Sequence, residues 1–255
     1  MTYFIILIAF FSNFAIPWLY SRLSKFQLKR KLSKSNTLVL SFDDGPSNRL
    51  TPLILNKLSK YNIRATFFLL GRNVEGSESL VRKIAAQGHE ICSHGYEHLN
   101  YWKVSPVKAI NDIKKGWQTI DNALAADRRV YPFRPPHGKL TLITLMYLWL
   151  NKTAICYWTL VTGDTYDLDK QDIDGVISKA KKNCGDVFLT HDFERRNEAV
   201  NENVINTLDR ILEMAHESNM KSATISEFMS SRRNNSFNTA KAKAQADRII
   251  DRGIE

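Results

Sequence analysis

Apolar residues between positions 37 and 229 follow two alternating spacings. Short runs rich in β-branched and aromatic residues predict strands, because such side chains favour buried, pleated positions. Between these runs, apolar residues recur every three or four positions, which predicts helices that bury one face. The predicted strands are residues 37–42, 65–70, 89–93, 130–133, 153–158, 186–190 and 221–224.

Strands that alternate with helices predict one α/β domain with parallel strands. The clearest helix begins after Ser105-Pro106, and a second apolar stripe falls within residues 204–215. Two architectures fit the count of strands: an open doubly wound sheet, or a (β/α) barrel with about seven repeats. No glycine-rich phosphate loop follows residues 37–42, which weakens the case for a dinucleotide-binding fold.

Residues 3–20 form an uncharged apolar stretch, interrupted by Ser12, Asn13 and Pro17. Its length is close to the roughly 20 residues of a membrane-spanning helix. We therefore expect a hydrophobic N-terminal helix that anchors the chain in a membrane. The basic residues after it predict that the following domain lies on the cytoplasmic side, with an exported or periplasmic location as the alternative. The other interpretation is a hydrophobic helix packed on the domain.

The charge of the chain lies mainly at its two ends. The sequence has 36 basic and 26 acidic residues, a net charge of +10. Residues 1–36 carry six basic and no acidic side chains, residues 230–255 carry six and three, and residues 37–229 are nearly neutral at +1. This pattern argues against nucleic-acid binding. It predicts an anchor with a basic flank (1–36), a central domain (37–229) and a polar basic tail (230–255).

The three cysteines give no paired pattern along the chain. They are Cys92, Cys156 and Cys184. An odd, sparse set predicts neither a disulfide framework nor a cysteine metal site.

Side chains able to do chemistry follow five of the predicted strands. In parallel α/β barrels the active site forms at the carboxyl ends of the strands. The residues in question are Asp43, Asp44, His94, His98, Arg134, Asp164 and His191.

The types of these residues predict a metal-dependent hydrolase. His94 and His98 are four residues apart and, with one carboxylate from residues 43–44, can bind one metal ion while leaving positions open for water and substrate. Such a set suits Zn²⁺ best, with Co²⁺, Fe²⁺, Mn²⁺ or Ni²⁺ as alternatives. The second carboxylate can act as a base and His191 as an acid, oriented by Asp164.

At these residues the sequence resembles the polysaccharide deacetylase family, carbohydrate esterase family four. The resemblance extends over residues 37 to about 229 and implies a distorted TIM-like (β/α)7 barrel. Its motifs occur in the family's order: SFDDGPS (41–47), SHGYEH (93–98), FRPPHG (133–138), a weaker fourth motif near residues 158–165, and VFLTHD (187–192).

The resemblance also implies a role for each site residue. Asp43 is then the base that deprotonates a metal-bound water, and Arg134 orients it. The implied metal ligands are Asp44, His94 and His98, and the implied acid is His191, oriented by Asp164. The implied substrate-binding residues are Pro136, His137, Gly138 and Leu189, with Leu189 as a pocket wall and the N–H of His137 holding the oxyanion.

The chain departs from the family's motifs at several places. Gly95 stands where Ser or Thr is usual, so a hydrogen bond that supports the loop would be absent. Thr165 stands where a Trp usually lines the acetyl pocket. A second alignment of this motif pairs Asp164 with Asp167 and places Leu168 at the Trp position; we prefer the first.

The resemblance implies hydrolysis of an N-acetyl group on an amino sugar, in a polysaccharide, an oligosaccharide or a glycolipid. Acetate and a free amine are the products. The alternatives are a metal-dependent O-acetyl esterase or deformylase of a lipid-linked sugar and, more remotely, an inactive membrane-anchored sugar-binding protein. The expected partners are therefore an N-acetylated glycan or glycolipid and a membrane, reached through residues 3–20.

Overall fold

Strands and helices alternate in the computed structural model, which describes residues 2–126, 130–166 and 171–230. The strands are β1 (Thr37–Asp43), β2 (Thr66–Leu69), β3 (Glu90–Ser93), β4 (Leu160–Val161), β5 (Gly185–His191) and β6 (Lys221–Ser222). The helices are α1 (Thr2–Leu32), α2 (Leu50–Lys60), α3 (Gly71–Val74), α4 (Glu78–Ala86), α5 (Pro106–Leu124), the 3-10 turn η1 (Pro136–Gly138), α6 (Leu142–Leu150), α7 (Ile173–Asn183) and α8 (Glu198–Glu217).

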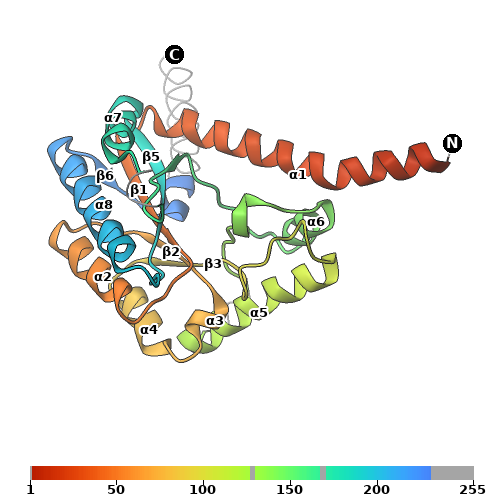
Figure 1. Ribbon diagram of the computed structural model, residues 1–255, viewed down its shortest axis with the longest axis horizontal. Coiled ribbons are helices and arrows are strands. Elements are labelled where there is room, and N and C mark those ends of the chain that lie inside the picture. Colours follow the sequence, from red (N-terminus) through yellow and green to blue (C-terminus); the bar gives the residue numbers. More distant parts are fainter. Residues whose placement is uncertain (1, 127–129, 167–170, 231–255) are drawn as a thin grey trace, which may run out of the picture.

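The strands form one parallel sheet, as the alternating pattern predicts. Their order is β3-β2-β1-β5-β4, and β6 pairs with the start of β1. Every residue of β1 is buried, because helices cover the outer face of the sheet while side chains fill its inner face. Figure 1 shows α2, α4, α5, α7 and α8 around the strands.

Isolated bridges continue the sheet past β3 and bring it round towards β5. Phe133 bridges both Ser93 and Ile155. Further along the same segment, the N–H of Thr159 donates to the carbonyl of Val187 in β5 at 3.0 Å. The sheet therefore curves into a barrel. On the side between β3 and β4, the strands are replaced by segments that pair through single bridges.

Two predicted strands are therefore wrong in their bounds. Residues 130–133 and 153–158 form only the bridges at Phe133 and Ile155, and the strand nearby is β4 at Leu160–Val161. Pro132 has no N–H to donate, and two further prolines follow Arg134, so this segment cannot sustain a ladder of hydrogen bonds.

Helix α5 begins where the sequence predicts. The Ser105 side chain accepts a hydrogen bond from the N–H of Lys108, and Pro106 occupies the first turn. Ile113, Trp117 and Ile120 are buried in the main core, as their spacing indicates.

The lower interior of the barrel holds a smaller apolar cluster. Leu32, the last residue of α1, lies within it, and Lys25 of α1 places its Nζ 3.7 Å from the centre of the Trp158 ring. Helix α1 therefore packs against the base of the barrel. The buried members of the cluster are Leu32, Val39, Phe68, Cys92, Cys156, Val187 and Ile225.

All three cysteines of the chain are free thiols.

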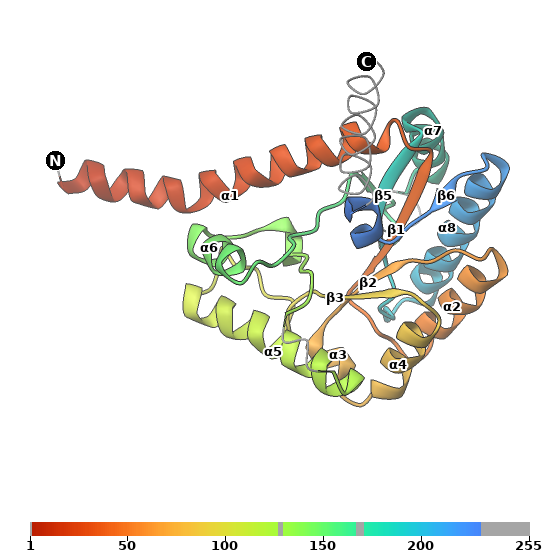
Figure 2. The same cartoon turned by 180° about the vertical axis from the view of Figure 1, so that it is seen from behind.

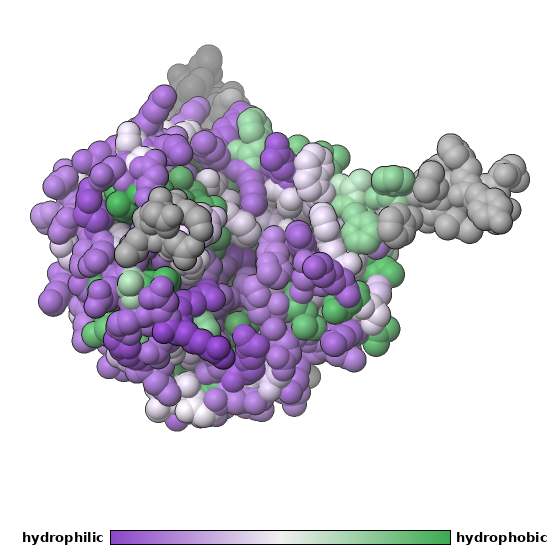
Figure 3. Space-filling model, in the orientation of Figure 1, coloured by the Kyte–Doolittle hydropathy of each residue, from purple (hydrophilic) through white to green (hydrophobic). Residues whose placement is uncertain are grey.

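Helix α1 continues from the apolar stretch into the basic residues without a break. It passes beside α6, where the N–H of Leu142 donates to Asn13 Oδ1 at 3.2 Å and the rings of Phe14 and Trp102 lie 5.5 Å apart. Figure 2 shows the two helices side by side from behind. In the space-filling view, hydrophobic residues gather around α1 and α6, whereas the body of the domain is mostly hydrophilic (Figure 3).

The membrane location predicted from residues 3–20 is wrong. Within the described ranges, no helix carries an apolar stretch of sufficient length to cross a membrane. Polar Asn13 and the basic residues from Arg22 onward interrupt or bound the apolar run. The predicted tail lies outside the described residues from Ser231 onward.

Candidate active site

Asp43 and Asp44 lie where β1 ends and the chain turns. Asp43 is the last residue of β1 and pairs with His191 of β5 in the parallel ladder. Asp44 has a φ of 72°, and the peptide between Gly45 and Pro46 is cis. A Cβ at Gly45 would lie 2.1 Å from Asp192 Oδ1, so this turn requires glycine. The turn brings both carboxylates to the wall of the same cavity.

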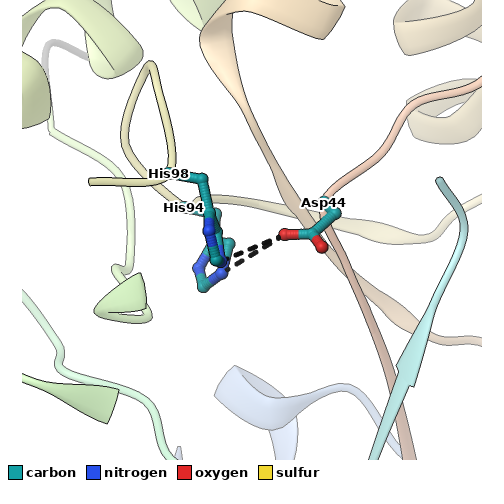
Figure 4. Close-up of side chains that lie close together, drawn as sticks. All are labelled: Asp44, His94 and His98. Atoms are coloured by element: carbon teal, nitrogen blue, oxygen red, sulfur yellow. Dashed lines mark ion pairs between the residues drawn. The ribbon is translucent and has the colours of Figure 1, made fainter. Parts of the chain in front are cut away.

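Asp44, His94 and His98 point towards one another across the top of the barrel (Figure 4). Asp44 Oδ1 lies 3.4 Å from Nε2 of His98 and 3.7 Å from Nε2 of His94. His94 is buried, and 27 % of the His98 side chain is exposed. Ligand atoms from all three lie within 4.8 Å of one another, so the group could hold one metal ion.

The chemistry of these three groups fits a divalent cation. Asp44 Oδ1 is buried and has no hydrogen-bond partner in the described part of the chain. An unpartnered buried carboxylate oxygen is costly, and a cation between it and the two imidazoles would compensate that cost. His94 Nδ1 lies 2.7 Å from the carbonyl of Arg134, which directs Nε2 towards Asp44.

Burial also favours the neutral form of His94. It lowers the pKa of His94 to about 3, against the opposing charge of Asp44. A neutral imidazole is the form that binds a metal ion.

The loop from His94 to His98 is held by an acid that the sequence analysis did not single out. Asp112 of α5 accepts hydrogen bonds from the backbone N–H groups of Tyr96 and Glu97, at 3.2 and 2.8 Å, and from the hydroxyl of Tyr101, at 2.8 Å. Gly95 has a φ of +85°, and a Cβ there would lie 2.4 Å from Asp112 Oδ2. Asp112 therefore provides the loop support that was expected to be absent. In the sequence, Asp112 is marked only as an acidic residue beside the apolar stripe of α5.

Arg134 lies fully buried in the barrel, below Asp43. Its Nη1 donates to Asp43 Oδ1 at 2.6 Å and to the hydroxyl of Ser41 at 2.8 Å, while its guanidinium stacks 3.9 Å from the centre of the Phe68 ring. Burial raises the pKa of Asp43, and the charge of Arg134 opposes that rise. The contact expected between Arg134 and Asp43 is therefore present.

His191 and Asp164 form a second polar cluster on the same cavity. His191 Nδ1 lies 3.0 Å from Asp164 Oδ1, and the N–H of His191 donates to Asp164 Oδ2 at 2.7 Å. Burial lowers the pKa of His191, but the charge and hydrogen bond of Asp164 outweigh it, together with the charges of Asp43 and Asp44, and raise that pKa to about 9. The structure thus brings Asp164 to His191, while Asp167 and Leu168 of the other alignment lie outside the described residues.

These groups surround a cavity of about 380 Å³. His137 and Leu189 line it, as does Thr165, which stands at the family's Trp position. His137 has a φ of 56°, and its ring lies 4.6 Å from that of His98. Pro136 and Gly138 are not among the lining residues; Pro135 lies at the cavity, and Gly138 packs against Trp158.

Arg195 is a further residue of the site that the sequence analysis did not single out. Its Nη2 lies 3.3 Å from Asp44 Oδ2, so the two oxygens of Asp44 have different neighbours. It lies in the loop after β5, and no motif placed it near Asp44. Only the fold brings together these residues, which are 151 positions apart.

Comparison with known proteins places the chain in a family. Residues 30–148 match the family described as Polysaccharide deacetylase. A peptidoglycan-N-acetylglucosamine deacetylase of Bacillus cereus is 31% identical over 162 residues, which cover 61% of this chain and 72% of that protein. The chain belongs to the polysaccharide deacetylase family. The resemblance noted from the five motifs is therefore confirmed.

Other members of the family agree in sequence and in structure. Another Bacillus cereus peptidoglycan-N-acetylglucosamine deacetylase is 36% identical over 156 residues, or 60% of this chain, and the chain spans only 55% of that relative's length. A solved peptidoglycan N-acetylglucosamine deacetylase superposes with a TM-score of 0.68 at 28% identity, covering 77% of this chain and 89% of that one. The α/β fold with a parallel sheet is thus shared with the barrels of this deacetylase family.

We predict that Asp112→Ala lowers the free energy of unfolding by about 3 kcal/mol, because it leaves two backbone N–H groups and the Tyr101 hydroxyl without their acceptor. Chemical denaturation followed by circular dichroism measures this change. Asp174→Ala removes an exposed carboxylate that pairs with Arg210, and it should change stability little. Equal effects of the two substitutions would contradict the role given to Asp112.

Proposed function

We propose that this family member hydrolyses the N-acetyl group of N-acetylglucosamine residues in a glycan, with Zn²⁺ bound by Asp44, His94 and His98. The observation that carries the proposal is the arrangement around one cavity. Three potential ligands converge on one side, and Asp43 and His191 lie beside them with partners suited to a base and an acid. Two imidazoles and one carboxylate are a donor set that zinc accepts.

A cation at this position would lower the pKa of a coordinated water and polarise the acetyl carbonyl. Asp43 is placed to take a proton from the attacking water, because it is buried beside the proposed ligands and its Oδ2 lies 3.7 Å from Nε2 of His94. Arg134 holds the other oxygen of Asp43, Oδ1, and thereby fixes the direction of Oδ2.

His191 is the proposed acid for the leaving amine. Asp164 accepts a hydrogen bond from the Nδ1–H of His191, which leaves Nε2 of the protonated ring to donate a proton towards the cavity. A pKa of about 9 keeps this imidazole protonated at neutral pH. The backbone N–H of His137 is proposed to stabilise the negative charge that develops on the carbonyl oxygen.

The reaction then balances without a further reactant. Water oxygen bonds to the acetyl carbon, the carbon–nitrogen bond breaks, and the nitrogen takes the proton from His191. Acetic acid and the free amine of the sugar leave the site, and the acid passes its proton to the amine or to solvent as acetate forms. The proton that Asp43 took from water returns to His191.

The proposed substrate is based on the names of the relatives in the comparison. Both Bacillus cereus proteins are named peptidoglycan-N-acetylglucosamine deacetylases. An inactive sugar-binding protein is disfavoured because every group needed for water activation and protonation is present: Asp43, Asp44, His94, His98 and His191.

We expect loss of the metal to abolish acetate release. Chelator-treated protein should release no acetate from chitotetraose (four N-acetylglucosamine residues), and added Zn²⁺ should restore release. Asp44→Ala and His94→Ala should bind no Zn²⁺ by calorimetry, whereas His216→Ala, a histidine on α8, should behave as wild type. Full activity in metal-free protein, or activity on O-acetyl or N-formyl sugars alone, would refute the proposal.

The dependence of kcat on pH should report the pairing of His191 with Asp164. The acid form of His191 is needed, so kcat should fall as pH rises through its pKa. Asp164→Asn removes the group that raises this pKa, and the fall in kcat should move to lower pH. Acetate release measured between about pH 6 and 10 tests this. Asp186→Asn is the control, because Asp186 is a buried carboxylate on β5 that does not line the cavity. An unshifted alkaline limb in Asp164→Asn would exclude His191 as the acid.

A further inference from the structure

A groove of about 610 Å³ opens beside the active-site cavity. It lies between the turn after β1, the segment around α3 and the loop after β5, and it includes residues 46–48 and 193–196. Arg72, Phe193 and Arg195 line both the groove and the cavity. A glycan that places one sugar in the cavity can therefore extend its neighbouring sugar past these three side chains.

The carboxylates of the groove already have partners. Glu194 and Glu198 both accept hydrogen bonds from Arg49, and Glu75 accepts one from the hydroxyl of Tyr96. Each of these acids is therefore hydrogen-bonded without any ligand, and Glu194 and Glu198 share the single charge of Arg49. Among the described groove residues, the groups whose charge attracts an anion are Arg72, Arg195 and Arg196.

The two arginines at the junction keep donors available. Arg195 uses Nη2 on Asp44, and 36 % of its side chain is exposed. Among the described residues, Arg72 has one loose ion pair, with Glu97 at 3.6 Å, and 44 % of its side chain is exposed. A guanidinium binds a carboxylate or a phosphate through paired N–H groups, so these donors favour an anion.

The backbone of Arg195 is held by two hydrogen bonds to one side chain. The Asn201 side chain accepts from the N–H of Arg195 at 2.7 Å and donates to its carbonyl at 2.8 Å. The guanidinium of Arg195 also lies 5.5 Å from the centre of the Phe193 ring. Arg195 is thus held at the junction before any substrate arrives.

We propose that Arg72 and Arg195 form an anion subsite, which binds a carboxylate or phosphate substituent on the sugar next to the one that is deacetylated. The inference rests on the proposed deacetylase function and specifies its substrate class. It makes Arg72 and Arg195 determinants of specificity.

The test compares each anionic substrate with a neutral counterpart. The first substrate is a tetrasaccharide in which N-acetylglucosamine alternates with its lactyl ether, a sugar that carries a carboxylate. The second is the methyl ester of the same molecule, in which those carboxylates are uncharged. A third is chitotetraose carrying 6-phosphates, which separates phosphate from carboxylate recognition. For wild type, kcat/KM for acetate release should be about 5- to 10-fold higher on an anionic substrate than on its neutral counterpart, with the difference mainly in KM.

Substitution of the arginines should remove this preference. Arg72→Gln and Arg195→Gln should each bring the ratio of anionic to neutral kcat/KM close to one, and Arg72→Lys should retain part of it. Arg210→Gln is the matched control, because Arg210 is also about half exposed and pairs with Asp174 away from the groove. Raising the salt concentration should lower the wild-type ratio. Zn²⁺ affinity, measured in parallel, should be unchanged in Arg72→Gln, since Arg72 contacts no proposed ligand.

The outcomes separate this inference from the proposed function. Equal rates on the anionic and neutral substrates, with acetate still released, would overturn the anion subsite alone. A preference for the phosphate substrate over the carboxylate one would support the subsite and identify its ligand. No acetate from any of the substrates would overturn the proposed function and the subsite with it.

Discussion

The site depends on one buried cation, the guanidinium of Arg134. A charge inside a barrel is tolerated only where partners offset its desolvation, and Arg134 has Asp43, Ser41 and the face of Phe68. The carbonyl of the same residue meets Nδ1 of His94. Arg134 therefore connects a carboxylate at the end of β1 with an imidazole that follows β3. Removal of its charge would leave Asp43 buried without its cationic partner. The base therefore depends on the side chain of Arg134, and the direction of a proposed metal ligand depends on its carbonyl.

Much of the fold could be predicted because its signals are local. The run from Thr37 to Asp43 is apolar up to its final carboxylate, and Ser105-Pro106 starts a helix by its own chemistry. The pairings at Phe133 and Ile155 were harder to predict, because each isolated bridge needs a partner segment that only the folded sheet supplies, although Pro132 already marks the first segment as a poor strand. The membrane prediction failed for a related reason. It treated residues 3–20 alone, whereas Asn13 and Phe14 contact residues far along the chain.

Some residues of the candidate site could likewise be predicted from local signals in the sequence, and others could not. Asp43 and His191 end β1 and β5, while Asp44 and the histidines of the 93–98 motif follow β1 and β3. Parallel strands carry all of them to one edge. Asp112 and Arg195 have no such signal, because each acts through a fold contact with a residue distant in sequence. Asp112 also explains the departure at Gly95, where its carboxylate occupies the space that a side chain would need. These supporting contacts can be recognised only once the chain is folded.

Two adjacent carboxylates have different proposed tasks, Asp44 as a metal ligand and Asp43 as the base. Asp43→Asn tests that division most directly, because the amide keeps the shape of the side chain and removes the base. We predict that this variant binds one Zn²⁺ per chain, as wild type does, while acetate release from chitotetraose falls about 100- to 10,000-fold. Loss of Zn²⁺ binding in Asp43→Asn, or acetate release at the wild-type rate, would contradict it.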